Sequence, residues 1–150
     1  MTKVQKQILC LDFDGVIHSY NSPWKGASEI PDPPVPGAIE FILSAMKSFE
    51  VNIYSSRSNQ VGGISAMQKY IRNNIMDLGY SEILANTIVN HEIKWPQAKP
   101  AAFVTIDDRV VCFTGKFPSI ENLLDFKPWN WEERQVAKNS SYTKSNLTSN

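Results

Sequence analysis

The chain has 150 residues, which is enough for one domain with a complete core and too few for us to expect two. Hydrophobic residues make up 42% of it and charged residues 20%, as is ordinary for a globular protein. Lys plus Arg number 15 and Asp plus Glu number 15, so the formal net charge is zero. We therefore expect no strong general binding to nucleic acid or to an anionic membrane through long-range charge.

The amino-acid sequence shows no membrane-spanning or secretory signal. No run approaches the roughly 20 apolar residues of a membrane span, and the start of the chain lacks the apolar region of a secretory signal. Both cysteines, Cys10 and Cys112, lie in apolar runs, where a free thiol behaves as a small hydrophobic group. We expect a cytoplasmic protein without a membrane partner and without a disulfide. The sequence leaves the oligomeric state open.

The first strong local feature is an apolar run from Ile8 that ends in two carboxylates, Asp12 and Asp14, and then breaks at Gly15. Its length and composition predict a buried strand. Residues two apart in a strand point the same way, so both carboxylates should leave the strand end together. Like charges this close favour a cation between them, and oxygen ligands are what Mg²⁺ prefers.

The remaining elements follow in chain order. A loop or small hairpin is predicted over residues 16–36, which are rich in Pro and Ser. Apolar spacing then predicts a helix from Pro36-Gly37 onward, a strand over 51–55, and a helix from Ile64 to about Asn74. After these we expect a helical piece, strands near 87–89, over 103–106 and over 110–113, and a short helix around 120–124. Residues 138–150 are almost devoid of apolar side chains and predict a disordered tail, leaving 1–137 as a single domain.

Strands that alternate with helices predict an α/β fold: a three-layer, Rossmann-like domain with a mainly parallel central sheet and helices on both faces. In such sheets the ligand crevice lies beyond the carboxyl ends of the strands. Chemically active side chains fall at three predicted strand ends: Asp12 and Asp14, Ser55, and Asp107 with Asp108. Their convergence predicts one site.

Taken in order, these motifs resemble the haloacid dehalogenase-like superfamily of phosphohydrolases. The resemblance rests on Asp12-Phe13-Asp14-Gly15 after a strand, Ser55 at the end of the next, Lys99 before a later strand, and Asp107-Asp108 at its end. It spans roughly residues 8–125. Residues 16–36 are too short for an inserted cap domain, and 56–98 are used by predicted elements, so the resemblance is to a small member without a cap. It implies a Mg²⁺-dependent phosphomonoesterase.

The resemblance also implies roles for the four aspartates. Asp12 would attack phosphorus and form an aspartyl-phosphate. Asp14 would act as general acid toward the leaving oxygen and then as base toward water. Mg²⁺ would be held by Asp12, the backbone carbonyl of Asp14, and Asp107, with Asp108 as a further ligand or as an anchor behind the ligands.

Around the phosphoryl group, the resemblance implies a hydrogen bond from Ser55, with neighbouring Ser56 as the alternative. Lys99 would neutralise the phosphate, a role for which Lys94 competes. Arg57 would either reach the phosphate or substrate, or pair with an acid. Ser55 and Lys99 are thus candidate catalytic residues, and Ser55, Ser56, Arg57 and Lys99 are candidate substrate-binding residues.

Trp24 and Lys25, in the loop after the aspartates, are our candidates for contact with the rest of the substrate. Trp24 would stack on a base or sugar, or else plug the core. A crevice without a cap favours a bulky phosphorylated substrate: a polynucleotide end, a phosphoprotein or a phosphorylated glycan. A small nucleotide, a sugar phosphate or another phosphorylated metabolite fits if another subunit covers the site. A phosphotransferase with the same site, and a catalytically silent binding module with the same fold, remain alternatives. A dehalogenase is disfavoured, because Asp14 supplies an acid that carbon–halogen cleavage does not need.

Overall fold

The sheet has three parallel strands. The computed structural model of the chain describes residues 2 and 4–147. Strands β1 (Ile8–Leu11), β2 (Glu50–Ile53) and β3 (Val104–Ile106) lie in the order β2-β1-β3. The register places Leu11 beside Ile53 on one side and beside Ile106 on the other. The predicted α/β class with a parallel sheet is confirmed.

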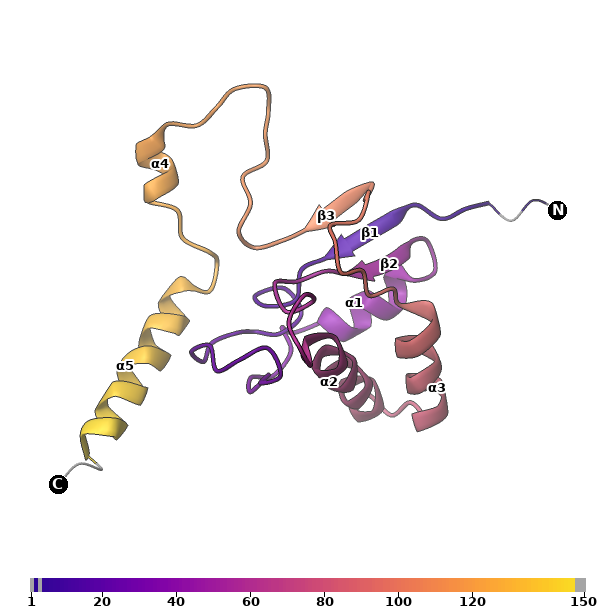
Figure 1. Cartoon of the computed structure of the whole chain (residues 1–150), viewed down its shortest axis with the longest axis horizontal. Coiled ribbons are helices and arrows are strands. Elements are labelled where there is room, and N and C mark those ends of the chain that lie inside the picture. Colours follow the sequence, from indigo (N-terminus) through magenta and orange to yellow (C-terminus); the bar gives the residue numbers. More distant parts are fainter. Residues whose placement is uncertain (1, 3, 148–150) are drawn as a thin grey trace.

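Helices occupy the crossovers, as parallel pairing requires. Helix α1 (Ala38–Ala45) joins β1 to β2, and α2 (Gly63–Asp77), α3 (Glu82–Thr87) and the π-helical turn η1 (Ile88–Glu92) lie between β2 and β3. Helices α4 (Ile120–Leu124) and α5 (Trp131–Leu147) follow β3. In Figure 1, α1, α2 and α3 gather beside β1 and β2, whereas α4 and α5 lie apart from them at the end of an extended segment.

The core is built from alternate strand residues and from helix residues three or four apart. Leu9, Leu11, Val51 and Ile53 are buried in the sheet, and Met67, Ile71 and Ile75 are buried along one side of α2. These spacings match the periods of a strand and of a helix. Phe13 also lies in this core, so the chain between the two aspartates is held from below.

The strand predicted near residues 87–89 is wrong: this stretch is the end of α3 and the start of η1. The helix begins early because the Ser81 hydroxyl caps it, accepting a hydrogen bond from the Leu84 amide at 3.2 Å. Extended pairing appears instead at Lys94, whose amide and carbonyl bond to Val51 and Ile53 of β2 at 2.9 and 3.0 Å.

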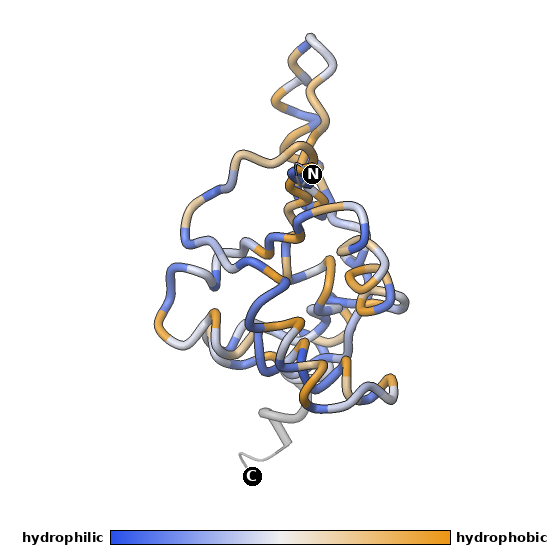
Figure 2. Tube along the Cα trace, turned by 90° about the vertical axis from the view of Figure 1, so that its right-hand side faces the viewer, coloured by the Kyte–Doolittle hydropathy of each residue, from blue (hydrophilic) through white to orange (hydrophobic). Residues whose placement is uncertain are grey.

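The short strand predicted over 110–113 is also wrong, because in the described chain this segment has no neighbouring strand to pair with. Its apolar side chains are exposed, as are many of those from there to the end of α4; among them are Val110, Phe113, Phe117, Ile120 and Leu124. Figure 2 shows hydrophobic residues along this projecting segment as well as inside the body. The predicted helix around 120–124 is present as α4.

The chain returns to the body just before α5. The Trp129 indole Nε1 donates to the Gly15 carbonyl at 2.7 Å, and the Asn130 side-chain Nδ2 donates to the Ser19 carbonyl at 2.8 Å. Helix α5 then continues through residues 138–147, where we expected a disordered tail. Its first half is rich in helix-forming Glu, Arg, Gln and Ala. The end of that predicted tail, 148–150, lies outside the described residues.

Nowhere in the described part of the chain is a helix both long and apolar enough to cross a membrane.

Candidate metal centre

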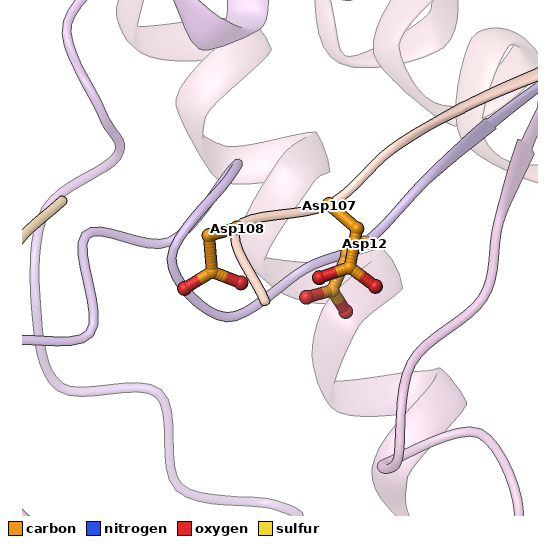
Figure 3. A group of neighbouring side chains, drawn as sticks. All are labelled: Asp12, Asp107 and Asp108. Carbon is orange, nitrogen blue, oxygen red and sulfur yellow. The ribbon is translucent and has the colours of Figure 1, made fainter. Parts of the chain in front are cut away.

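Three carboxylates meet at the carboxyl ends of two neighbouring strands. Asp12 follows β1 directly, and Asp107 and Asp108 follow β3. One oxygen from each of them lies within 4.8 Å of the others. Figure 3 shows Asp12 and Asp107 side by side, with Asp108 on the turn beyond them.

The sheet register explains this meeting. Leu11 pairs with Ile106, so the next residues along the two parallel strands, Asp12 and Asp107, emerge together. The Asp12 amide continues the ladder by donating to the Ile106 carbonyl at 2.9 Å. The convergence predicted for these acids is therefore present for Asp12, Asp107 and Asp108.

The electrostatics of this cluster favour a bound cation. Burial, together with the charges of Asp107 and Asp108, raises the pKa of Asp12 to about 8. Burial also raises the pKa of Asp108, and its Oδ1 is buried without a hydrogen-bond partner among the described residues. An unpartnered carboxylate oxygen beside two others fits a hard divalent cation such as Mg²⁺, which would replace the proton that the cluster otherwise retains.

Gly15 allows the turn after the aspartates to pass directly against Asp108. Its φ is +84°, and a Cβ atom at this position would overlap the Asp108 carboxylate. Glycine is the residue that adopts this conformation without strain and leaves the space free. The sequence break at Gly15 thus has a steric cause within the cluster itself.

Asp14 is held away from this cluster by two partners. Arg57 donates from Nε to Oδ2 at 2.8 Å and from Nη2 to Oδ1 at 3.0 Å, and His18 Nδ1 lies 2.8 Å from Oδ1. Burial alone would raise the pKa of Asp14, but the hydrogen bonds from His18 and Arg57 outweigh it and lower the pKa below its ordinary value. The carboxylate is therefore held ionised, a state that suits a proton acceptor better than a donor.

His18 completes the support of Asp14. Its side chain is fully buried, and its Nε2 accepts a hydrogen bond from the Asp32 amide at 3.1 Å. Because Nε2 is an acceptor there, Nδ1 carries the proton that is donated to Asp14. Asp32 in turn receives hydrogen bonds from the amide and hydroxyl of Ser22, at 2.7 and 2.6 Å. No role for His18 was predicted from the sequence; its spacing of four residues from Asp14 was the available signal.

The Arg57 guanidinium is occupied by hydrogen bonds within the protein. Arg57 is 1% exposed, and its Nη1 donates to the carbonyls of Gly26, Ala27 and Glu29 at 3.1, 2.8 and 3.0 Å. Of the two roles considered from the sequence, the structure places Arg57 in the pairing with an acid. Its guanidinium also lies under the Trp24 ring, 4.5 Å from the ring centroid.

A small open cavity of ≈ 180 Å³ adjoins the nucleophile candidate; it is lined by Asp12, Asp14, Tyr20, Trp24, Ser56 and Arg109. Trp24 is 43% exposed there. The structure therefore brings Ser56 to the cavity wall, whereas Ser55 is buried in its own turn, where its Oγ accepts from the Arg57 amide at 3.2 Å.

Two predicted cations are not brought to this cavity. Lys25 and Lys99 are exposed, and neither belongs to the lining. Lys94 lies near His91, to whose carbonyl its ammonium donates at 3.1 Å, in the wall of a different hollow. The sequence reasoning missed Tyr20 and Arg109; the position of Arg109 directly after Asp107-Asp108 was the signal that could have identified it.

Comparison of the chain with protein-family models, with curated proteins and with solved structures yields no match. The site must therefore be interpreted from its own geometry: a small α/β domain whose parallel sheet carries three aspartates that could hold a metal ion.

Proposed function

We propose that the protein is a Mg²⁺-dependent phosphomonoesterase of the haloacid dehalogenase-like kind, in which Asp12 is the nucleophile. The observation that carries this proposal is the meeting of Asp12 with Asp107 and Asp108 within 4.8 Å at adjacent strand ends. A carboxylate beside a metal site can attack phosphate because the cation offsets the repulsion between the two anions.

Asp12, Asp107 and Asp108 would hold the ion, whose chemistry is to neutralise negative charge on both reactants. A carboxylate oxygen of Asp12 attacks phosphorus, and the phosphoryl group is transferred to Asp12 as the bond from phosphorus to the ester oxygen breaks. The ester oxygen leaves with the electron pair of that bond and takes a proton from solvent water. Asp14, held ionised by Arg57 and His18, then accepts a proton from the water that attacks the aspartyl-phosphate. Ser56, at the cavity wall, is placed to donate a hydrogen bond to the phosphoryl group.

The substrate we propose carries a planar group next to its phosphate, as in a nucleotide or a polynucleotide end. The cavity of ≈ 180 Å³ is smaller than the roughly 300 Å³ at the low end of pockets that enclose a small ligand. The phosphoryl end fits inside, and the rest of the substrate extends over the margin. Trp24, supported from behind by Arg57, lies at that margin with much of its surface in solvent and is suited to stacking on a base.

The test is hydrolysis of an aryl phosphate with and without EDTA, alongside Asp12→Asn. We expect activity that needs Mg²⁺ and disappears in the variant, and acid-stable labelling of Asp12 by borohydride trapping of the phosphorylated protein. Activity that persisted in EDTA or in Asp12→Asn would overturn the mechanism. Comparison of nucleotides and 3′- or 5′-phosphorylated oligonucleotides with glycerol phosphate then tests the substrate class.

A binding module with the same fold is the second candidate, and the exposed position of Lys99 outside the cavity favours it. Such a module would bind Mg²⁺ without hydrolysing any phosphate ester in the same assay. A phosphotransferase would instead show faster release of product when an alcohol acceptor is added.

A further inference from the structure

Binding of a phosphate would require positive charge in a cavity that is lined in part by carboxylates. Asp12 and Asp14 line the cavity, and Asp107 and Asp108 lie against Asp12. A phosphate dianion that approaches these carboxylates is repelled. One divalent ion offsets only part of that charge, so a second positive group is needed beside the phosphate.

The cations near the site differ in whether they are available. Arg57 is buried, and its guanidinium is occupied by Asp14 and by three backbone carbonyls. Lys99 is exposed away from the cavity. Arg109 lines the cavity together with Asp12 and Ser56, and its side chain is 54% exposed.

Arg109 is also positioned with the metal ligands. Its amide donates to Asp107 Oδ1 at 2.9 Å, so the residue is fixed to the turn that carries Asp107 and Asp108. In the described chain its guanidinium makes one ion pair, a long one of 3.9 Å to Asp108 Oδ2, and donates no hydrogen bond to protein. Its donors thus remain free for a ligand in the cavity.

We propose that Arg109 is a catalytic residue that binds the transferring phosphoryl group, supplying the positive charge that the resemblance assigns to Lys99. This inference rests on the proposed function and adds a residue to it. The planar, positively charged guanidinium presents paired N–H donors that match two phosphate oxygens. Charge that spreads over the equatorial oxygens during transfer strengthens these contacts.

The test compares Arg109→Ala, Arg109→Lys and Lys99→Ala with the unchanged protein, and uses Lys116→Ala as a control for removal of an exposed cation from the same segment. Two readouts are taken: kcat and KM for an aryl phosphate, and the affinity for inorganic phosphate in the presence of Mg²⁺ by calorimetry. Arg109 is half exposed, so these variants should fold; a thermal melt checks this.

We expect Arg109→Ala to lower kcat/KM by about 10²-fold, as removal of one transition-state donor does, and to lower phosphate affinity by about tenfold. Arg109→Lys should recover part of kcat/KM and part of the phosphate affinity, because lysine keeps the positive charge but lacks the paired N–H donors of the guanidinium. Lys99→Ala should cost less than Arg109→Ala, and Lys116→Ala should match the unchanged protein.

A larger loss in Lys99→Ala, or phosphate affinity that is equal in Arg109→Ala and the unchanged protein, would overturn this assignment while leaving the phosphatase proposal intact. If the unchanged protein hydrolyses no ester, the proposed function fails. The phosphate titrations then still decide whether Arg109 binds phosphate. Phosphate binding that is absent, or that is unchanged in Arg109→Ala, counts against this role, and binding that weakens in Arg109→Ala supports it.

Discussion

Arg57 and Asp14 form a two-point ion pair beneath the cavity, with Nε to Oδ2 at 2.8 Å and Nη2 to Oδ1 at 3.0 Å. The Arg57 side chain is 1% exposed and that of Asp14 13%. The same guanidinium also binds three carbonyls of the 16–36 loop. One side chain therefore joins the turn after β2, the turn after β1 and the loop that follows it.

Removing the guanidinium should destabilise the protein strongly. Arg57→Ala leaves a buried carboxylate without its cation, which costs about 3–5 kcal/mol in comparable buried pairs. We expect the melting temperature to fall by roughly 10 °C, while Arg72→Ala on α2 stays within about 2 °C of the unchanged protein. Arg57→Lys should also destabilise, because an ammonium cannot form both bonds to Asp14. Melting temperatures that are unchanged in Arg57→Ala would contradict the role assigned to this pair.

The metal-free protein should become less stable as the pH rises from about 4 to about 8. The pKa of Asp12 is raised from an ordinary value of 3.8 to about 8, so its contribution to stability is present below the ordinary pKa and is lost as the pH rises through 8. Asp14 has a lowered pKa, so its contribution is lost only on the acid side, below the ordinary value. In EDTA, Asp12→Asn should therefore melt about 3 °C or more above the unchanged protein at pH 9.

Thermal melts at pH 6, 7, 8 and 9 check this, with and without Mg²⁺. Asp12→Asn should already be the more stable protein at pH 6, and its advantage should grow up to about pH 8, because the folded protein retains a proton on Asp12 that the unfolded chain has lost. Mg²⁺ should raise the melting temperature of the unchanged protein at pH 8 and act weakly on Asp12→Asn. A stability that rises from pH 6 to pH 9 without metal, with Asp12→Asn following the same curve, would contradict the raised pKa.

The leaving group should govern the rate because Asp14 is held ionised. An aryl oxygen departs without a proton, whereas an alkyl oxygen needs an acid that contributes about 10²–10⁴-fold. We expect kcat/KM for p-nitrophenyl phosphate to exceed that for glycerol phosphate by about 10²-fold. His18→Gln removes one of the bonds that lower the pKa of Asp14, so it should narrow this ratio. Equal rates for the two esters would show that Asp14 reaches its acid form readily.

Gly15→Ala should weaken metal binding through a steric effect. The added Cβ overlaps the Asp108 carboxylate, and the alanine must adopt a φ of +84°, which is unfavourable for a residue with a side chain. A matched control is Gly79→Ala, whose φ is +97° with nothing within 4 Å, so it tests backbone strain alone. We expect both variants to lose about 1 kcal/mol of stability from strain, and Gly15→Ala alone to lose Mg²⁺ affinity by calorimetry. If both variants lost Mg²⁺ affinity to the same extent, the effect of Gly15→Ala on metal binding would come from backbone strain and not from overlap with Asp108.

Local patterns were sufficient to predict the features that depend on neighbouring residues along the chain. The parallel arrangement predicted that the strand ends carrying Asp12 and Asp107 would converge on one site, and the register of Leu11 with Ile106 brings these two residues together. The helical spacing of Met67 and Ile71 likewise predicted α2. Both follow from periods that a short window of sequence contains.

Partners that are distant in the chain could not be read in this way. Arg57 lies 43 residues from Asp14, and its choice of that carboxylate over the substrate depends on how the 16–36 loop folds over it. The predicted strand near 87–89 failed because a single hydroxyl, that of Ser81, starts a helix six residues earlier. Apolar composition alone does not separate a short buried strand from such a helix.

The bonds from Trp129 to Gly15 and from Asn130 to Ser19 span 114 and 111 residues. A segment late in the chain thus fixes the turn that follows the first two aspartates, although it adds no carboxylate to the cluster of Asp12, Asp107 and Asp108. A truncated version that stops at residue 128 would retain every proposed metal ligand and yet lose these two hydrogen bonds. Expression trials that seek the smallest working fragment should keep Asn130 inside its boundary.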